Sequence, residues 1–182
     1  ARGLTPNGVG GVRVFGIYFV RIAAEIDFPR WFPDVAWVWL RRRNIVRQAV
    51  SLALAAASGN WTSLDRHPPK GAYSPVLLRR CLKTLLLHDG VWEGHFRARE
   101  IAPLPLWYED IAPRLDDAVR AIAAHAGIAL ANSPDATRLK LARQSGAENE
   151  MWVARFLAEP GMADLVARLD AARGLPPRPG LA

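Results

Sequence analysis

A continuous apolar run of strand length, Val35 to Leu40, stops abruptly at three consecutive arginines, Arg41 to Arg43. A run this short and without alternation is typical of a parallel strand that is covered on both faces. Asn44 can then cap a helix from Ile45 to about Ala57, and Gly59 lies where such a helix ends. The segment therefore predicts a strand, a turn and a helix, and α/β proteins bind ligands at the carboxyl ends of such strands.

The rest of the chain predicts mostly helices. A long helix is expected from Ser74 to Phe96, with the serine as its cap and Pro75 in its first turn. Leu104 to Tyr108 is a second β-like segment, whose prolines indicate a sheet edge or the start of a strand. Asp110 is expected to cap the next helix, with Pro113 in its first turn. Leu115, Val119, Ile122 and Ala126 form the apolar stripe of this same helix, and Gly127 ends it. The other expected elements are a strand or short buried segment over Val12 to Val20 and two helices, Ala147 to Ala158 and Met162 to Ala172.

The length of 182 residues fits one domain, expected over residues 1–174, followed by a flexible, proline-rich tail over residues 175–182. No apolar run approaches the roughly 18 residues of a membrane span. The first residues lack the apolar core of a signal peptide, so we expect a cytoplasmic protein. The single cysteine, Cys81, excludes an internal disulfide.

The net charge of +7 suits an anionic partner such as a nucleotide, a sulfated compound or nucleic acid. Nucleic acid is the weakest of these hypotheses. The basic residues gather at one strand end instead of forming the broad stripe that a nucleic-acid interface needs.

A polar stripe runs along the otherwise apolar helix that follows the arginines. Asn44, Arg47 or Gln48, and Ser51 fall on one side of it, at spacings of three, four and seven residues. A helix N-terminus offers backbone amides and a positive dipole end, and an arginine such as Arg43 can add a bidentate clamp. The arrangement suits a phosphate monoester across the start of the helix. A surface ion-pair cluster is the plainer alternative.

The segment from Arg43 to Ser51 resembles the sulfotransferase signature Arg-Asn, four residues, then Ala-Val-Ser. Together with Gly59-Asn60-Trp61, it resembles the trehalose 2-sulfotransferase family of bacteria. The resemblance extends over about residues 5 to 158. Weaker segments that support it are Thr5 to Val9, Trp92 with Phe96, Tyr108-Glu109-Asp110, Leu141 to Gln144, and Trp152 with Arg155-Phe156.

This resemblance implies a P-loop-type α/β fold, in which helices flank a parallel sheet and the C-terminal half is rich in helices. It implies 3′-phosphoadenylyl sulfate as co-substrate, with Arg43 and Ser51 holding its 3′-phosphate. Arg47 joins them on the same side of the helix, and the matching C-terminal segment adds Arg143 and Lys140. The acceptor would be a hydroxyl group, on a carbohydrate such as trehalose or on a related small molecule.

Two parts of the family pattern are missing from the sequence. One is the loop of the Arg-Ser-Gly-Ser-Thr kind that holds the 5′-phosphosulfate, and the other is the family's presumed catalytic glutamate. The fold is therefore expected to be incomplete at the N-terminus, and this chain alone to be impaired in catalysis. Sulfuryl transfer needs a general base and positive charge on the leaving phosphate. The catalytic residues are left unassigned.

Other chemistry-bearing residues have plainer explanations. Glu109 and Asp110 suit a strand end and a helix cap, although they could also be catalytic carboxylates. The group His88, Asp89 and His95 lacks the ligand spacing of a zinc helix, so no metal is expected. His67 is a weak candidate for the base, and Trp61 could stack on adenine or a sugar.

Two further hypotheses concern partners. A non-catalytic remnant that binds the nucleotide or a partner protein is the main alternative to an active sulfotransferase. An exposed apolar edge of the Ser74–Phe96 helix would pair two copies of the chain as a homodimer.

Overall fold

The structure is a computed structural model, which describes residues 8–61, 72–111, 113–130, 132 and 146–176. The chain forms two compact units. The first comprises Ala1–Val35 and Leu86–Ile101, and the second Ala36–Leu85 and Ala102–Ala182. Helix α4, Pro75–Ala98, contributes to both. The prediction of one domain over residues 1–174 with a loose tail stays a prediction.

The first unit consists of helices. It contains α1, Gly16–Glu25, the short α2, Phe28–Trp31, and the C-terminal part of α4. Gly16 lies so close to α4 that a Cβ there would come within 2.9 Å of the carbonyl oxygen of His88. Phe19 is buried and stacks on Trp92, with 4.6 Å between ring centroids. The packing of this unit therefore depends on a glycine contact and on aromatic rings.

The strand or buried segment predicted from Val12 to Val20 is wrong. A helix begins at Gly16 instead, and Val12 is 87 % exposed. The residues that pack on α4, Gly16 and Phe19, are three positions apart. That is a helical spacing, which the high β-propensity of the segment obscured.

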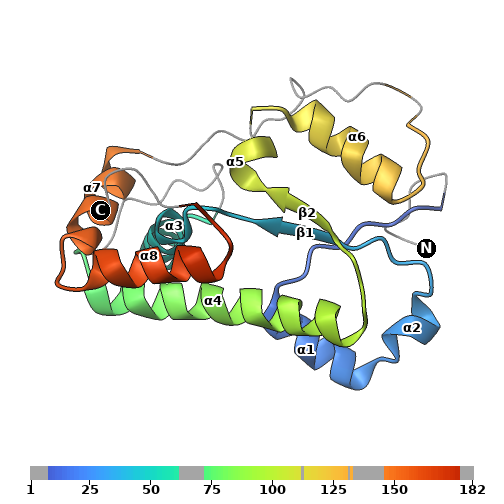
Figure 1. The fold of residues 1–182 in the computed structure, drawn as a ribbon, viewed down its shortest axis with the longest axis horizontal. Coiled ribbons are helices and arrows are strands. Elements are labelled where there is room, and N and C mark those ends of the chain that lie inside the picture. The colour runs from blue at the N-terminus through green and yellow to red at the C-terminus, as the bar shows by residue number, and fades with distance from the viewer. Residues whose placement is uncertain (1–7, 62–71, 112, 131, 133–145, 177–182) are drawn as a thin grey trace. The chain divides into compact units, whose positions relative to one another are not determined.

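The second unit is built on two parallel strands (Figure 1). Strand β1, Val38–Arg41, pairs with β2, Leu104–Trp107, in a register that sets Val38 opposite Leu104 and Arg41 opposite Trp107. The observed strand therefore begins three residues later than predicted. The carbonyl of Trp37, just before it, still accepts a hydrogen bond from the amide of Leu104. Because Leu40 is 52 % exposed, the prediction that β1 is covered on both faces is also wrong.

The helices of this unit mostly follow the sequence pattern. Helix α3, Ile45–Ser58, is capped by Asn44 and ends at Gly59, whose φ of 79° is left-handed. Helix α4 is capped by the Ser74 hydroxyl, which accepts from the amide of Leu77 at 3.2 Å. The remaining helices are α5, Tyr108–Ile111; α6, Leu115–His125; α7, Ala147–Leu157; and α8, Met162–Ala172. Within the described part of the chain, no helix is both long and apolar enough to cross a membrane.

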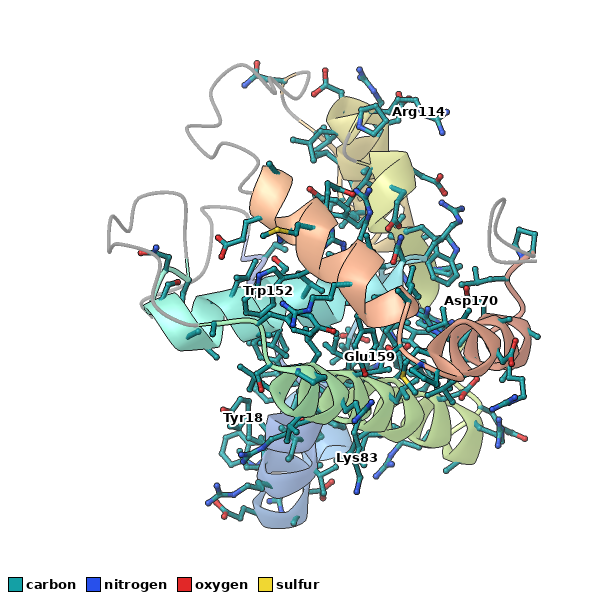
Figure 2. All side chains as sticks on the ribbon, turned by 90° about the vertical axis from the view of Figure 1, so that its left-hand side faces the viewer. Tyr18, Lys83, Arg114, Trp152, Glu159 and Asp170 are labelled. Carbon is teal, nitrogen blue, oxygen red and sulfur yellow. The ribbon has the colours of Figure 1, made fainter. Side chains whose placement is uncertain are left out.

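The core of the second unit holds α3 in place. Its buried face is formed by Ile45, Val46, Ala49, Val50 and Ala53, and α3 packs against α7. Helix α7 contributes Trp152, Val153 and Phe156 to the interior. Trp152, labelled in Figure 2, meets the ring of Tyr73 edge-on, with centroids 5.5 Å apart. The helix that carries the predicted phosphate-binding residues is therefore anchored from the side by α7.

Phe156→Ala should destabilise this unit by about 3–5 kcal/mol, because a side chain only 1 % exposed would be replaced by a cavity. Urea unfolding at neutral pH measures the change. Met151→Ala on the same helix is the control: Met151 is 60 % exposed, so a change within about 0.5 kcal/mol is expected. Equal losses in the two variants would contradict the packing of α7.

Candidate anion-binding site

The turn between β1 and α3 lies beside α5 because the two strands run parallel. Arg41 and Trp107 are the last paired residues of β1 and β2. The chain continues from them into the β1–α3 turn and into α5, so both follow the same edge of the sheet. Parallel pairing thus brings Arg43 and Asn44 against Glu109 and Asp110, which follow them by about 66 positions in the sequence.

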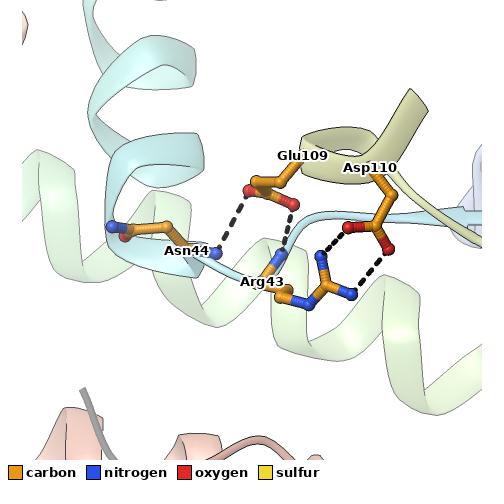
Figure 3. Close-up of polar contacts among 4 residues, drawn as sticks. All are labelled: Arg43, Asn44, Glu109 and Asp110. Atoms are coloured by element: carbon orange, nitrogen blue, oxygen red, sulfur yellow. Dashed lines mark hydrogen bonds and ion pairs between the residues drawn. The ribbon is translucent and has the colours of Figure 1, made fainter. Parts of the chain in front are cut away.

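Glu109 bonds the backbone of the turn (Figure 3). Its Oε2 accepts a hydrogen bond from the amide of Arg43 at 3.0 Å, and its Oε1 accepts a longer one from the amide of Asn44 at 3.4 Å. The Oδ1 of Asn44 in turn accepts from the amide of Arg47 at 3.0 Å. The expectation that the amides at this helix start are available to a ligand is therefore wrong for these three residues, since side chains of the protein already satisfy them.

Asp110 holds the side chain of Arg43 (Figure 3). Two guanidinium nitrogens of Arg43 donate to the two carboxylate oxygens, at 2.7 Å and 2.6 Å, which is the bidentate geometry typical of such pairs. These hydrogen bonds raise the pKa of Arg43 and lower the pKa of Asp110. Arg43 is therefore oriented by two hydrogen bonds to one carboxylate.

The predicted helix cap at Asp110 is wrong. Asp110 lies inside the one-turn helix α5, and α6 begins at Leu115 with Arg114 in the cap position and Pro113 before it. The sequence pattern was consistent with a cap, but the contact with Arg43 comes from the distant pairing of the two strands. Glu109 and Asp110 contact the β1–α3 turn instead, which their explanation as a strand end and a helix cap did not predict.

Aromatic rings support the neighbouring arginines. Arg41 lies over the ring of Trp39 at 4.2 Å and over that of Trp107 at 4.9 Å. Arg42 lies over the ring of Tyr108 at 4.3 Å. Planar guanidinium groups stack favourably on aromatic faces. Arg41 at the end of β1 and the two arginines that follow it are thus oriented by contacts with Trp39, Trp107, Tyr108 and Asp110.

A residue that sequence reasoning missed also reaches the turn. Arg173, at the end of α8, donates to the carbonyl oxygen of Arg42 at 2.7 Å and to that of Arg43 at 3.1 Å. The glycine that follows it, Gly174, is a usual sign of a helix end. Nothing in that signal says that the preceding arginine would contact a turn about 130 positions earlier in the chain.

The other predicted phosphate-binding residues have different placements. Arg47 forms an ion pair with Glu150 at the start of α7. Ser51 is half-buried on α3, two helical turns beyond Asn44. Arg143 lies outside the described residues, as do Lys140 and His67. Trp61 is described and is 62 % exposed. Arg43, Arg47 and Ser51 thus lie on one strand–turn–helix unit, with Arg43 directed to Asp110 and Arg47 to Glu150.

The described residues contain no group of three His, Cys, Asp or Glu side chains that could hold a metal ion. The chemistry that the turn can provide is ionic. Arginine side chains gather there: Asp110 pairs with Arg43, Glu150 pairs with Arg47, Arg41 and Arg42 lie over aromatic rings, and Arg173 donates to backbone carbonyls. A surplus of positive charge at the N-terminus of a helix favours an anionic ligand.

Two parallel strands flanked by helices make this a helix-rich α/β protein. The sequence comparison specifies the class further. Residues 20–159 match the sequence model of the Stf0 sulphotransferase family, which is most of the chain, and the chain belongs to that family. No curated protein gave a significant match. The matched range includes the β1–α3 turn and α5, and it ends before α8.

Asp110→Asn should lower the melting temperature at pH 7, because it removes the negative partner of Arg43. The folded state lowers the pKa of Asp110 below its ordinary value of 3.8, so the pair stabilises the fold above about pH 4. That contribution is lost as the pH falls through the lowered pKa. The difference in melting temperature between wild type and variant should therefore stay constant from pH 6 to about pH 4 and shrink as the pH falls further towards pH 3.

The control for this experiment is Asp117→Asn, which removes an exposed carboxylate from α6. Its melting temperature should follow that of the wild type across the range. A deficit in Asp110→Asn that stayed constant down to pH 3 would mean that the Arg43–Asp110 pair contributes nothing to stability.

Proposed function

We propose that this chain binds 3′-phosphoadenylyl sulfate and serves in the transfer of its sulfuryl group to a hydroxyl group. The observation that carries the proposal is the placement of Arg43. Its side chain is oriented by Asp110 at the carboxyl end of a parallel strand and at the N-terminus of α3. Membership of a sulphotransferase family supports the same function.

In this proposal Arg43 and Ser51 hold the 3′-phosphate of the donor. A phosphate monoester carries about two negative charges at neutral pH, which suits the arginines that gather at the turn. Ser51 adds a hydroxyl on the same helix, and Arg47 lies one turn before it. Arg143 completes the proposed set, on the strength of the sequence resemblance alone.

The two carboxylates of α5 have a consistent role in this proposal. Glu109 occupies the amides of Arg43 and Asn44, so it gives the turn its shape instead of contacting the donor. Asp110 uses two of the five N–H groups of a guanidinium and fixes its plane. Both residues would thus prepare the site before the nucleotide arrives, which reduces the ordering cost of binding.

The reaction that we propose for this protein is a substitution at sulfur. An acceptor hydroxyl oxygen forms the new bond to sulfur, and the bond from sulfur to the phosphate oxygen breaks. The hydroxyl proton passes to a general base, and adenosine 3′,5′-bisphosphate leaves. We propose a carbohydrate acceptor such as trehalose or a related small molecule, and we assign no residue as the base.

The test is titration of the purified chain with adenosine 3′,5′-bisphosphate by calorimetry, beside Arg43→Ala. This product keeps the 3′-phosphate and needs no catalysis. Losing a charge-assisted phosphate contact should cost about 1.5–3 kcal/mol, which corresponds to roughly a tenfold to hundredfold higher Kd.

The matched control is Arg120→Ala, which removes the same charge from an exposed position on α6. It should bind within about twofold of the wild type, because exposed charges away from a site add only a screened long-range attraction. If the wild type does not bind the bisphosphate, the donor site is refuted, and the alternative of a partner-binding remnant takes its place. If Arg43→Ala and Arg120→Ala bind alike, Arg43 is not the phosphate ligand.

A further inference from the structure

Two consecutive peptide groups in the β1–α3 turn are bonded at both of their polar ends. In the first, the carbonyl of Arg42 accepts from Arg173, and the amide of Arg43 donates to Glu109. In the second, the carbonyl of Arg43 accepts from Arg173, and the amide of Asn44 donates to Glu109. One guanidinium and one carboxylate therefore hold the backbone on either side of the Arg43 Cα.

The signs of these charges match the peptide dipoles. A carbonyl oxygen is the negative end of the peptide group and meets the guanidinium, whereas the N–H is the positive end and meets the carboxylate. Hydrogen bonds with one ionised partner are stronger than those between neutral groups. A guanidinium is also suited to two neighbouring acceptors, because its donors lie in a fixed planar fork.

The end of α8 fixes the position of Arg173. Gly174 is left-handed with φ of 70°, and its amide bonds the carbonyl of Ala171 at 3.0 Å. The amide of Leu175 bonds the carbonyl of Asp170 at 2.9 Å. This pair of bonds is the Schellman arrangement, which leaves Arg173 as the last residue before the reversal. Asp170 is 2 % exposed, so this end of α8 is packed against the rest of the unit.

The guanidinium groups of Arg43 and Arg173 both lie over the ring of Trp107. The guanidinium carbons of Arg43 and Arg173 lie 5.2 Å and 5.9 Å from its centroid. Arg173 is thus fixed by its own helix end, by an aromatic ring and by two carbonyls, all within the second unit.

We infer that Arg173 is a positioning residue for the donor site: it holds the backbone at Arg43 so that the side chain of Arg43 meets the 3′-phosphate. This inference rests on the proposed function. Arg173 lies beyond residues 20–159, so the family match does not assign it a role. Arg173 contacts the turn and not the nucleotide, so its effect on binding must pass through Arg43.

The experiment is a double-mutant cycle read by calorimetry with adenosine 3′,5′-bisphosphate. Arg173→Gln should raise the Kd by about tenfold in the wild-type background. In the Arg43→Ala background the same change should raise it by less than about twofold, because residues that act through one contact are not additive. A purely structural role would weaken binding by the same factor in both backgrounds.

Arg173→Lys is a second variant that separates loss of the hydrogen bonds from a folding defect. Lysine keeps the charge but lacks the planar fork, so we expect a native circular dichroism spectrum and an affinity between those of wild type and Arg173→Gln. Arg168→Gln on an exposed position of the same helix is the control and should bind like the wild type.

The outcomes separate the two proposals. If the wild type binds, and Arg173→Gln binds as tightly as Arg168→Gln or loses the same factor with and without Arg43, the positioning role is wrong while the donor site stands. If the wild type does not bind the bisphosphate, the donor site is wrong and the role of Arg173 is refuted with it.

Discussion

The candidate site depends on the hydrogen bonds that the backbone amides of Arg43 and Asn44 donate to Glu109. They connect a segment that ends one strand to a helix that follows the other, and they exist because the strands pair in parallel. Each strand is only four residues long, so the sheet alone offers few bonds with which to fix the turn. The carboxylate of Glu109 and the guanidinium of Arg173, which lie outside the sheet, supply further hydrogen bonds to the turn.

The charged side chains around the turn have different partners. Glu109 and Arg173 form hydrogen bonds with the backbone of the turn, and Asp110 forms hydrogen bonds with the side chain of Arg43. Arg41 and Arg42 rest on aromatic rings, which support a guanidinium without neutralising its charge. Stacking on rings thus orients Arg41 and Arg42, while carboxylates orient the backbone and the side chain of Arg43.

Local sequence signals predicted the parts of the fold that local physics controls. Asn44 at the start of α3, Gly59 at its end, Ser74 before α4, and the bounds of α8 from Met162 to Ala172 all agree with the structure. Capping depends on residues within one helical turn, so a single sequence contains the information.

The errors arose where distant contacts decide the outcome. Asp110 looked like a helix cap because its partner, Arg43, lies 67 positions away. The Val12–Val20 segment looked like a strand because the α4 surface that Gly16 packs against is not visible in its own composition. The resemblance to sulfotransferases predicted the family, which the family match confirms, whereas Arg43 and Ser51 as phosphate ligands stay a prediction. It gave no reason to consider Arg173, whose role depends on the geometry of a helix end.

Amide hydrogen exchange at Arg43 and Asn44, in the wild type and in Glu109→Ala, tests most directly whether Glu109 holds the turn. The amide of Gly59, which bonds the carbonyl of Ala55 at the far end of α3, serves as the internal reference. The account predicts that the two turn amides are protected in the wild type and exchange at least about tenfold faster in the variant, while Gly59 is unchanged. Equal exchange rates at Arg43 and Asn44 in the two proteins would contradict it.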